Sequence, residues 1–277
     1  MLAEFVYCYL LRPWPLRPLA NWAIRQLLPA QVNFGEAVVV LNPDDPVVSG
    51  ALHFGVYEKA ETAFFQIACR EGMTFLDVGA NIGYYTALAA RAVGPNGKII
   101  ALEPDPDSFK YLEQTIAANV AENVQAFPVA ASDAPAKLPL YISADNRGDN
   151  RLYAPGESRP KIEVEAVAPD ALLAENKIDT VDLIKIDVQG YEPKVIDGLR
   201  DTITRSPKLT LLTEFWPKGI RDAGGDPTEF LNTLRDLNLT LHELNANGEL
   251  TELTDDADLI ARHPGRRYTN LVGRKQN

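Results

Sequence analysis

Short runs of apolar residues alternate with segments of helical periodicity along most of the chain. The runs are bounded by glycine or polar residues, which is typical of strands buried on both faces. Between them, apolar residues recur every three or four positions, as on one face of an amphipathic helix. This alternation predicts an α/β fold with a mostly parallel sheet. The predicted core strands are residues 73–78, 98–102, 124–130, 181–188 and 208–215, and the predicted helices are 59–71, 84–93, 107–119, 192–199 and 227–237.

The C-terminal part of the chain predicts a different kind of pairing. Residues 239–244 and 269–273 predict two strands that close the sheet as an antiparallel pair, with Asn247-Gly248 as a turn. The acidic segment 254–258 between them predicts either a solvated loop or the start of a helix.

The alternation lapses between residues 137 and 167. Two strand-like runs, 138–142 and 162–167, flank a polar loop at 145–151. Loops of this length inside a compact domain are often lids or binding loops. We therefore expect a β insertion of hairpin type before the fourth core strand, beside the functional edge, with a flexible surface loop as the alternative.

The residues before the alternating pattern predict an extension. Residues 1–50 contain one predicted helix, 16–28, and a short predicted strand, 37–41. Residues 51–277 predict one domain that carries the insertion at 137–167.

The apolar run at residues 1–11 is interrupted only by Glu4. It is too short to span a bilayer and lacks the basic region and cleavage site of a signal peptide. We favour packing of this extension on the domain. A contact with a membrane surface or with a second copy of the chain stays open, because Arg12, Arg17 and Arg25 lie among apolar residues.

Composition narrows the classes of function. The 277 residues are 46% hydrophobic and 23% charged, as in an ordinary globular protein. The formal charge of −11 disfavours nucleic-acid binding, which depends on neutralising phosphates. Cys8 and Cys69 lie far apart without C-x-x-C spacing, so they predict neither a disulfide framework nor a zinc site. This use of cysteine fits a reducing compartment, and we expect a cytoplasmic protein.

The first core strand ends in a glycine-rich turn. Asp77 is followed by Gly79 and Gly83, and then by a helix. Such a turn leaves backbone N–H groups beside a crevice, where a Cβ would block a ligand. Glu103, 20 positions after Gly83, ends the next strand, where a carboxylate can hold two ribose hydroxyls. Together these features predict a nucleoside site.

The glycine spacing separates two kinds of nucleoside ligand. A dinucleotide fingerprint needs G-x-G-x-x-G, whereas Gly79 and Gly83 form G-x-x-x-G. Asp77 would face a ligand ammonium group and would repel a pyrophosphate. The pattern resembles motif I of class I S-adenosylmethionine (SAM)-dependent methyltransferases. A nicotinamide-dependent oxidoreductase, a non-catalytic SAM-binding protein and a strand–turn–helix with incidental glycines stay as alternatives.

Further charged residues fall at predicted strand ends on the same edge. Lys185 and Asp187 are two positions apart and share a face of a regular strand. Because a buried strand seldom carries unpaired charges, they predict either an internal ion pair or an acid working at the active edge, which we favour. Glu214 ends the fifth core strand.

Three blocks resemble the FkbM family of SAM-dependent methyltransferases. They are Gly55-Val56-Tyr57-Glu58, residues 77–86, and Lys185-Ile186-Asp187-Val188-Gln189-Gly190-Tyr191-Glu192. Gln189 departs from the family, which commonly has glutamate there. The resemblance implies a seven-stranded Rossmann-like sheet with its last strand antiparallel, bound SAM, and O-methylation of a hydroxyl on a sugar, glycolipid or polyketide-type acceptor.

The resemblance also implies a division of roles within the site. Asp77 and the glycine turn would hold the methionine end of SAM, Glu103 its ribose, and the segment at Tyr57 would fold over the ligand. The predicted SAM-binding residues are Tyr57, Glu58, Asp77, Gly79, Ala80, Asn81, Gly83, Tyr84, Thr86, Glu103, Pro104, Asp105, Phe109, Ser132 and Asp133, of which Asp105, Phe109, Ser132 and Asp133 would border the adenine.

Methyl transfer to a hydroxyl is an in-line displacement in which the acceptor loses a proton, so a positioned base helps. We expect Asp187 to be that base, with Glu214 as the second candidate and Lys185 tuning the pair. Asp187 and Glu214 could together hold a magnesium ion. No third ligand adjoins them and no two histidines have ligand spacing, so we expect an enzyme that needs no metal.

Overall fold

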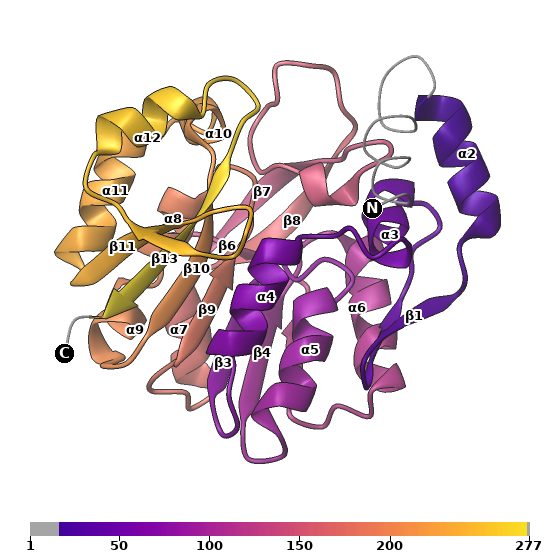
Figure 1. The fold of residues 1–277 in the computed structure, drawn as a ribbon, viewed down its shortest axis with the longest axis horizontal. Coiled ribbons are helices and arrows are strands. Elements are labelled where there is room, and N and C mark those ends of the chain that lie inside the picture. Colours follow the sequence, from indigo (N-terminus) through magenta and orange to yellow (C-terminus); the bar gives the residue numbers. More distant parts are fainter. Residues whose placement is uncertain (1–16, 276–277) are drawn as a thin grey trace.

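The computed structural model describes residues 17–275, and the apolar run at 1–11, with Cys8 and Arg12, lies outside this part. At its centre is an eight-stranded sheet in the order β12-β11-β13-β10-β9-β3-β4-β5 (Figure 1). The strands are β3 (Thr74–Val78), β4 (Lys98–Leu102), β5 (Val124–Phe127), β9 (Leu183–Ile186), β10 (Thr210–Phe215), β11 (Leu239–Leu244), β12 (Leu250–Glu252) and β13 (Thr269–Lys275).

The strand directions confirm the expected α/β fold. Strands β3, β4, β5, β9 and β10 are parallel, and β13 runs antiparallel between β10 and β11. The seven expected strands are therefore present, and the short β12 adds an eighth at the edge beside β11. The carboxyl ends of the parallel strands all meet at one edge of the sheet.

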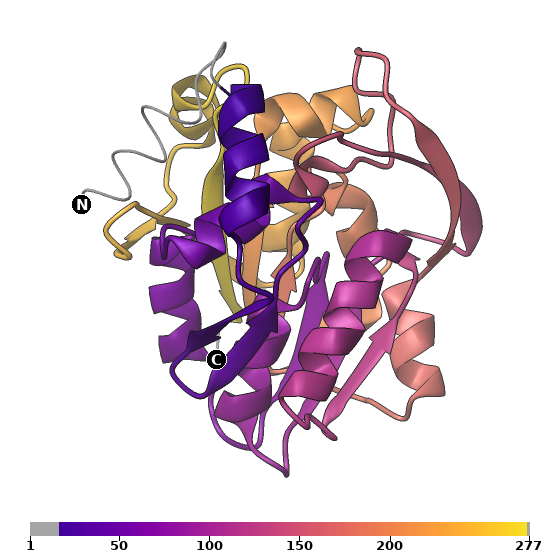
Figure 2. The same ribbon diagram turned by 90° about the vertical axis from the view of Figure 1, so that its right-hand side faces the viewer.

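Helices cover both faces of the sheet (Figures 1 and 2), because successive side chains of each strand point to opposite sides. Leu76 belongs to the larger core cluster, whereas Phe75 belongs to the core on the other face. The first face carries α7 (Pro169–Glu175), α8 (Glu192–Asp197), α9 (Arg200–Arg205), α10 (Pro217–Asp222), α11 (Pro227–Asp236) and α12 (Asp256–Arg262), and the second carries α4 (Lys59–Ala68), α5 (Tyr84–Val93) and α6 (Pro106–Ala118).

The N-terminal part adds elements to the second face. Helix α2 (Arg17–Leu27) leads to a hairpin of β1 (Gln31–Phe34) and β2 (Ala37–Val40), and then to α3 (Pro46–His53). Helix α3 is not among the predicted helices, and it starts at Pro46 because Asp45 caps it by accepting the N–H of Val48 at 3.0 Å. The boundary at residues 50 and 51 stays a prediction. No helix in the described part is both long and apolar enough to cross a membrane.

The expected insertion is present as a small separate sheet. Strands β7 (Ala136–Tyr141) and β8 (Lys161–Val167) pair antiparallel, and the two-residue β6 (Ala130–Ala131) pairs parallel with β8. The third core strand therefore ends at Phe127, earlier than expected, since the following residues join the insertion. The polar loop between β7 and β8 contains the short 3-10 helix η2 (Arg147–Asp149).

Two expectations near the C-terminus need correction or completion. The Asn247-Gly248 turn connects β11 to β12 and not to β13, because Asn245 N and Glu249 O close a tight hairpin at 3.0 Å. The acidic segment at 254–258 starts a helix, since Asp255 caps α12 by accepting the N–H of Asp258.

Candidate active site

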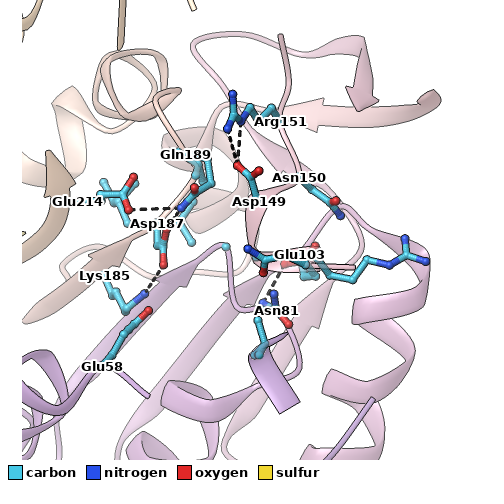
Figure 3. A pocket seen from close by; sticks show the side chains of 18 of the residues that line it. Glu58, Asn81, Glu103, Asp149, Asn150, Arg151, Lys185, Asp187, Gln189 and Glu214 are labelled. Carbon is cyan, nitrogen blue, oxygen red and sulfur yellow. Dashed lines mark hydrogen bonds and ion pairs between the residues drawn. The ribbon is translucent and has the colours of Figure 1, made fainter. Parts of the chain in front are cut away.

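A cavity of about 440 Å³ opens at the carboxyl ends of the parallel strands (Figure 3). The ends of β3, β4, β9 and β10 form one wall, and α2, α3 and the insertion loop at 146–152 form others. Arg266, Tyr268 and Asn270 approach from the segment before β13 and from its start. Open α/β sheets bind ligands at this edge, and the volume suits a ligand of nucleoside size.

Gly79 allows two loops of the site to touch. Its φ is +82°, and a Cβ placed on it would lie 2.1 Å from the backbone oxygen of Asp187. Its N–H donates to Leu102 O at 2.9 Å. Only glycine therefore lets the turn after β3 lie against the turn after β9. The predicted cofactor loop and the predicted base are in direct contact.

Glu103 is buried at the end of β4 with both carboxylate oxygens occupied by backbone donors. Oε2 accepts the N–H of Asn81 and Oε1 accepts the N–H of Asp105, each at 2.8 Å. Burial raises the pKa of Glu103 to about 8, although these two bonds lower it. The side chain lines the cavity, and each oxygen keeps a second lone pair that can accept a ligand hydroxyl.

Asp77 lies behind the cavity wall. It is 1% exposed, accepts a 2.6 Å hydrogen bond from Thr86 Oγ1, and is the direct cross-strand neighbour of Lys185. Burial raises its pKa, and the nearby Lys185 opposes the rise. Lys185, its neighbour, does line the cavity.

Each carboxylate oxygen of Asp187 has a hydrogen-bond donor beside it (Figure 3). Lys185 Nζ lies 3.3 Å from Oδ2, and Gln189 Nε2 donates to Oδ1 at 2.8 Å. The Gln189 amide also reaches Glu214 Oε2 at 3.4 Å. Asp187 thus forms an ion pair with Lys185, and its side chain, which is 22% exposed, still lines the cavity.

A second chain of contacts joins the same cluster from the side of α4. Tyr85 Oη donates to Glu58 Oε2 at 2.8 Å, and Lys185 Nζ lies 4.6 Å from the centre of the Tyr85 ring. Glu58 adopts a left-handed backbone with φ of +36° just before α4. This turn directs the Glu58 side chain into the cavity.

Carboxyl groups outnumber cations at this end of the cavity. Burial raises the pKa of Glu58 to about 7, and burial with the negative neighbour Asp187 holds the pKa of Glu214 well above its usual range. Asp187 and Glu58 outweigh the effect of burial on Lys185, so its pKa stays above the ordinary value. Glu214 Oε1 is buried without a hydrogen-bond partner. The cluster therefore suits a positively charged ligand.

Asp105 is bound by side chains of the insertion loop. It caps α6, and its Oδ2 accepts Arg147 Nη1 at 3.1 Å and Asn150 Nδ2 at 2.9 Å. The N–H of Arg147 donates to Asp45 Oδ2 at 3.0 Å. The polar loop thereby spans from α6 to the cap of α3 and closes one wall of the cavity.

An aromatic and cationic wall lies farther along the cavity. The Arg151 guanidinium lies 4.8 Å from the Trp216 ring centre and donates to Asp149 Oδ1 through Nε and Nη2 at 2.9 and 2.6 Å. Trp216 Nε1 donates to Gly265 O at 2.8 Å. Both residues are buried.

Half of the residues expected at the site line the cavity, and half lie behind it. Those that line it are Tyr57, Glu58, Gly79, Asn81, Glu103, Pro104, Lys185, Asp187 and Glu214. The expected residues that are not in its wall are Asp77, Ala80, Gly83, Tyr84, Thr86, Asp105, Phe109, Ser132 and Asp133.

The adenine side shows why some expected residues lie outside the wall. Ser132 Oγ donates to Asp133 Oδ1 at 3.0 Å, and Lys194 Nζ pairs with Asp133 Oδ2 at 2.7 Å, away from the cavity.

Several wall residues were not among our expectations. They are Asn21, Ile24, Val48, Ala51, Arg147, Asp149, Asn150, Arg151, Gln189, Trp216, Arg266, Tyr268 and Asn270. Two signals indicated part of this set: the polar composition of the 145–151 loop, and the place of Gln189 in the block that resembles the family.

Within residues 17–275, no three His, Cys, Asp or Glu side chains are grouped as metal ligands. The Gln189 amide lies between the two carboxylates that we considered for magnesium, at 2.8 and 3.4 Å.

Comparison with known proteins points to one enzyme class. The model of the family described as the methyltransferase FkbM domain matches residues 77–244. The chain is 26% identical over 225 residues to methyltransferase sdnD of Sordaria araneosa, covering 66% of this chain and 86% of that protein. It is 24% identical to the hexuronic acid methyltransferase AglP of Haloferax volcanii, covering 73% and 70%. It is 27% identical to the 2-O-methyltransferase NoeI of Sinorhizobium fredii, covering 47% and 59%.

Proposed function

The chain belongs to the FkbM family of SAM-dependent methyltransferases, and from this premise we propose that it methylates a hydroxyl group of a sugar, glycolipid or polyketide-type acceptor. A sugar is the favoured acceptor. Two of the relatives are named as a hexuronic acid methyltransferase and a 2-O-methyltransferase, which supports this choice.

The cofactor half of the cavity fits SAM. Gly79, in the turn after β3, lines the cavity beside Glu103, and Glu103 offers oxygen lone pairs to the two ribose hydroxyls. The surplus of carboxyl groups around Lys185 suits a cationic ligand. When bound, SAM supplies an electrophilic methyl group on a positively charged sulfur.

Asp187 is the proposed base, and its geometry is the observation that carries the proposal. With SAM and an acceptor bound, the Asp187 carboxylate would take the proton of the acceptor hydroxyl as that oxygen receives the methyl group. Lys185 at 3.3 Å and Gln189 at 2.8 Å fix that carboxylate in the cavity wall. Glu214, with one free oxygen, is the second candidate.

The test is turnover and SAM binding of the wild type and of Asp187→Asn, with sugar, glycolipid and polyketide acceptors. We expect the wild type to form an O-methyl ether, identified by NMR. The variant should lose about 10²- to 10⁴-fold in kcat and keep its SAM affinity in calorimetry. Methyl transfer to a carboxylate or nitrogen would contradict the proposal.

Two results separate this proposal from the alternatives. SAM binding without turnover on any acceptor would favour the non-catalytic reading. A simultaneous loss of SAM binding in Asp187→Asn would make Asp187 a ligand contact or a structural charge. Glu103→Gln serves as the matched control, because it should weaken SAM binding while leaving Asp187 and its neighbours in place.

A further inference from the structure

Helix α2 exposes an unusual amount of apolar surface. Leu19, Trp22 and Leu27 are 65%, 62% and 72% exposed, whereas Ala20 and Ile24 of the same helix are buried. The other exposed large apolar side chains of the described part, Ile67, Val120, Ile162 and Tyr268, lie on four separate segments. A cluster of this kind on one helix marks a contact surface.

The charge around α2 differs from the rest of the protein. The helix contains no acidic residue and two arginines, Arg17 and Arg25, so its formal charge is +2. The whole chain has a formal charge of −11. An apolar helix face with tryptophan and with basic residues in an otherwise acidic protein is typical of segments that lie on anionic lipid.

The position of α2 links this face to the cavity. Asn21 and Ile24, on the inner side of the helix, line the cavity wall. Asn21 Nδ2 also donates to Asp145 Oδ2 of the insertion loop at 3.0 Å. Helix α2 thus stands at the rim of the cavity and at the periphery of the molecule (Figure 1). A surface that contacts its outer face lies beside the cavity opening.

We propose that the α2 face formed by Leu19, Trp22 and Leu27 binds a lipid bilayer that contains anionic lipid. Resting on the function proposed above, this docking presents the cavity to an acceptor carried by a membrane lipid. A second copy of the chain is less well supported as the partner of this face. Stable dimers bury about 800 Å² per partner, and three side chains of one short helix supply less area than that.

The experiment is flotation of the full-length protein with vesicles of phosphatidylcholine alone or with about 30% phosphatidylglycerol. The wild type should float with the anionic vesicles, and less so at high salt. The triple variant Leu19→Ser, Trp22→Ser, Leu27→Ser should show at least about a 10-fold lower partition coefficient. The matched control, Ile67→Ser, Val120→Ser, Ile162→Ser, removes three exposed apolar groups elsewhere, which are 67%, 79% and 38% exposed, and should bind like the wild type.

The outcomes are separable from those of the methyl-transfer test. SAM calorimetry on both variants reports whether the fold is intact, since none of the six positions lies in the cavity wall. Failure of the wild type to bind either vesicle, or equal binding by the triple variant, would overturn the docking proposal. A dimer seen by light scattering and lost in the triple variant would assign the face to a second copy instead.

Discussion

At the scale of single residues, Gln189 connects the two halves of the catalytic cluster. Its backbone is left-handed with φ of +57°, and its carbonyl accepts the hydroxyl of Tyr153 at 2.7 Å. Its amide donates to Asp187 and Glu214. The left-handed backbone and the hydrogen bond from Tyr153 fix the amide between the carboxylates of Asp187 and Glu214. Gln189 thereby contacts Tyr153, 36 positions away along the chain, and Glu214, 25 positions away.

Removing this amide should affect turnover and not cofactor binding. In Gln189→Ala, Asp187 loses a charge-assisted hydrogen bond, so we expect kcat to fall about 10-fold with SAM affinity unchanged. In Gln189→Glu, a third carboxylate disfavours ionisation of the carboxyl cluster, so the acid limb of the pH–kcat profile should move to higher pH. Steady-state kinetics across pH measure both effects.

The control for this pair is Gln66→Ala, which removes an exposed amide on α4 and should leave kcat and the pH profile unchanged. If Gln189→Ala kept the wild-type kcat and pH profile, the amide would have only a structural role.

At the scale of elements, the insertion is held to the domain by its polar loop. Arg147 is 16% exposed and pairs with the buried Asp105 at 3.1 Å and with Asp107 at 2.7 Å. At the other end of β7, in the insertion sheet, Lys137 pairs with Glu163 and Glu165, and all three side chains are exposed. The two sets differ in burial, and hence in their expected energetic weight.

Arg147→Ala should therefore destabilise the protein and free the loop. Leaving Asp105 without its cation should lower the free energy of unfolding by about 1–3 kcal/mol. Limited proteolysis with mass spectrometry should show new cleavage within residues 145–151, and urea unfolding should show the loss of stability.

Lys137→Ala is the matched control. Because the partners of Lys137 are exposed, the free energy of unfolding should change by no more than about 0.5 kcal/mol and no new cleavage should appear. Equal effects of the two variants would mean that the loop is held by its backbone contacts alone.

At the scale of the whole molecule, buried carboxyl groups should control stability against pH. Burial raises the pKa of Asp45, Glu58 and Glu192 to about 7 and that of Glu103 to about 8. In the unfolded chain these groups ionise near their ordinary values of 3.8 and 4.5. Between about pH 5 and pH 8 the folded protein thus retains protons that the unfolded chain releases.

The free energy of unfolding should consequently fall as pH rises from 5 to 8, by on the order of 1 kcal/mol or more for each such carboxyl. Urea titrations of the ligand-free protein at four pH values measure this slope. Glu103→Gln should make the slope shallower, whereas the exposed Glu163→Gln should leave it unchanged. Stability that rises over this window would show that the carboxyls are ionised in the folded state.

The elements that the sequence predicts well are those with a local signal. The alternation of apolar runs and amphipathic segments located the core strands, because burial on both faces demands continuous apolar side chains. The glycine turn and Glu103 follow their strands directly, so their spacing along the chain places them at one edge. Helix α3 had no such signal, since its eight residues are apolar on most sides and follow a proline-rich turn.

What only the tertiary structure decided depends on contacts between distant residues. Arg147 meets Asp105 across 42 positions and Asp45 across 102, and no local period encodes such pairs. The register of β3 against β9 pairs Asp77 with Lys185, and Asp77 itself lies behind the cavity wall. The sequence by itself determined the sheet and the cofactor turn, because these follow from chain periodicity and backbone freedom. Packing alone decided which charged groups share the cavity, because their pairing depends on how the loops fold against one another.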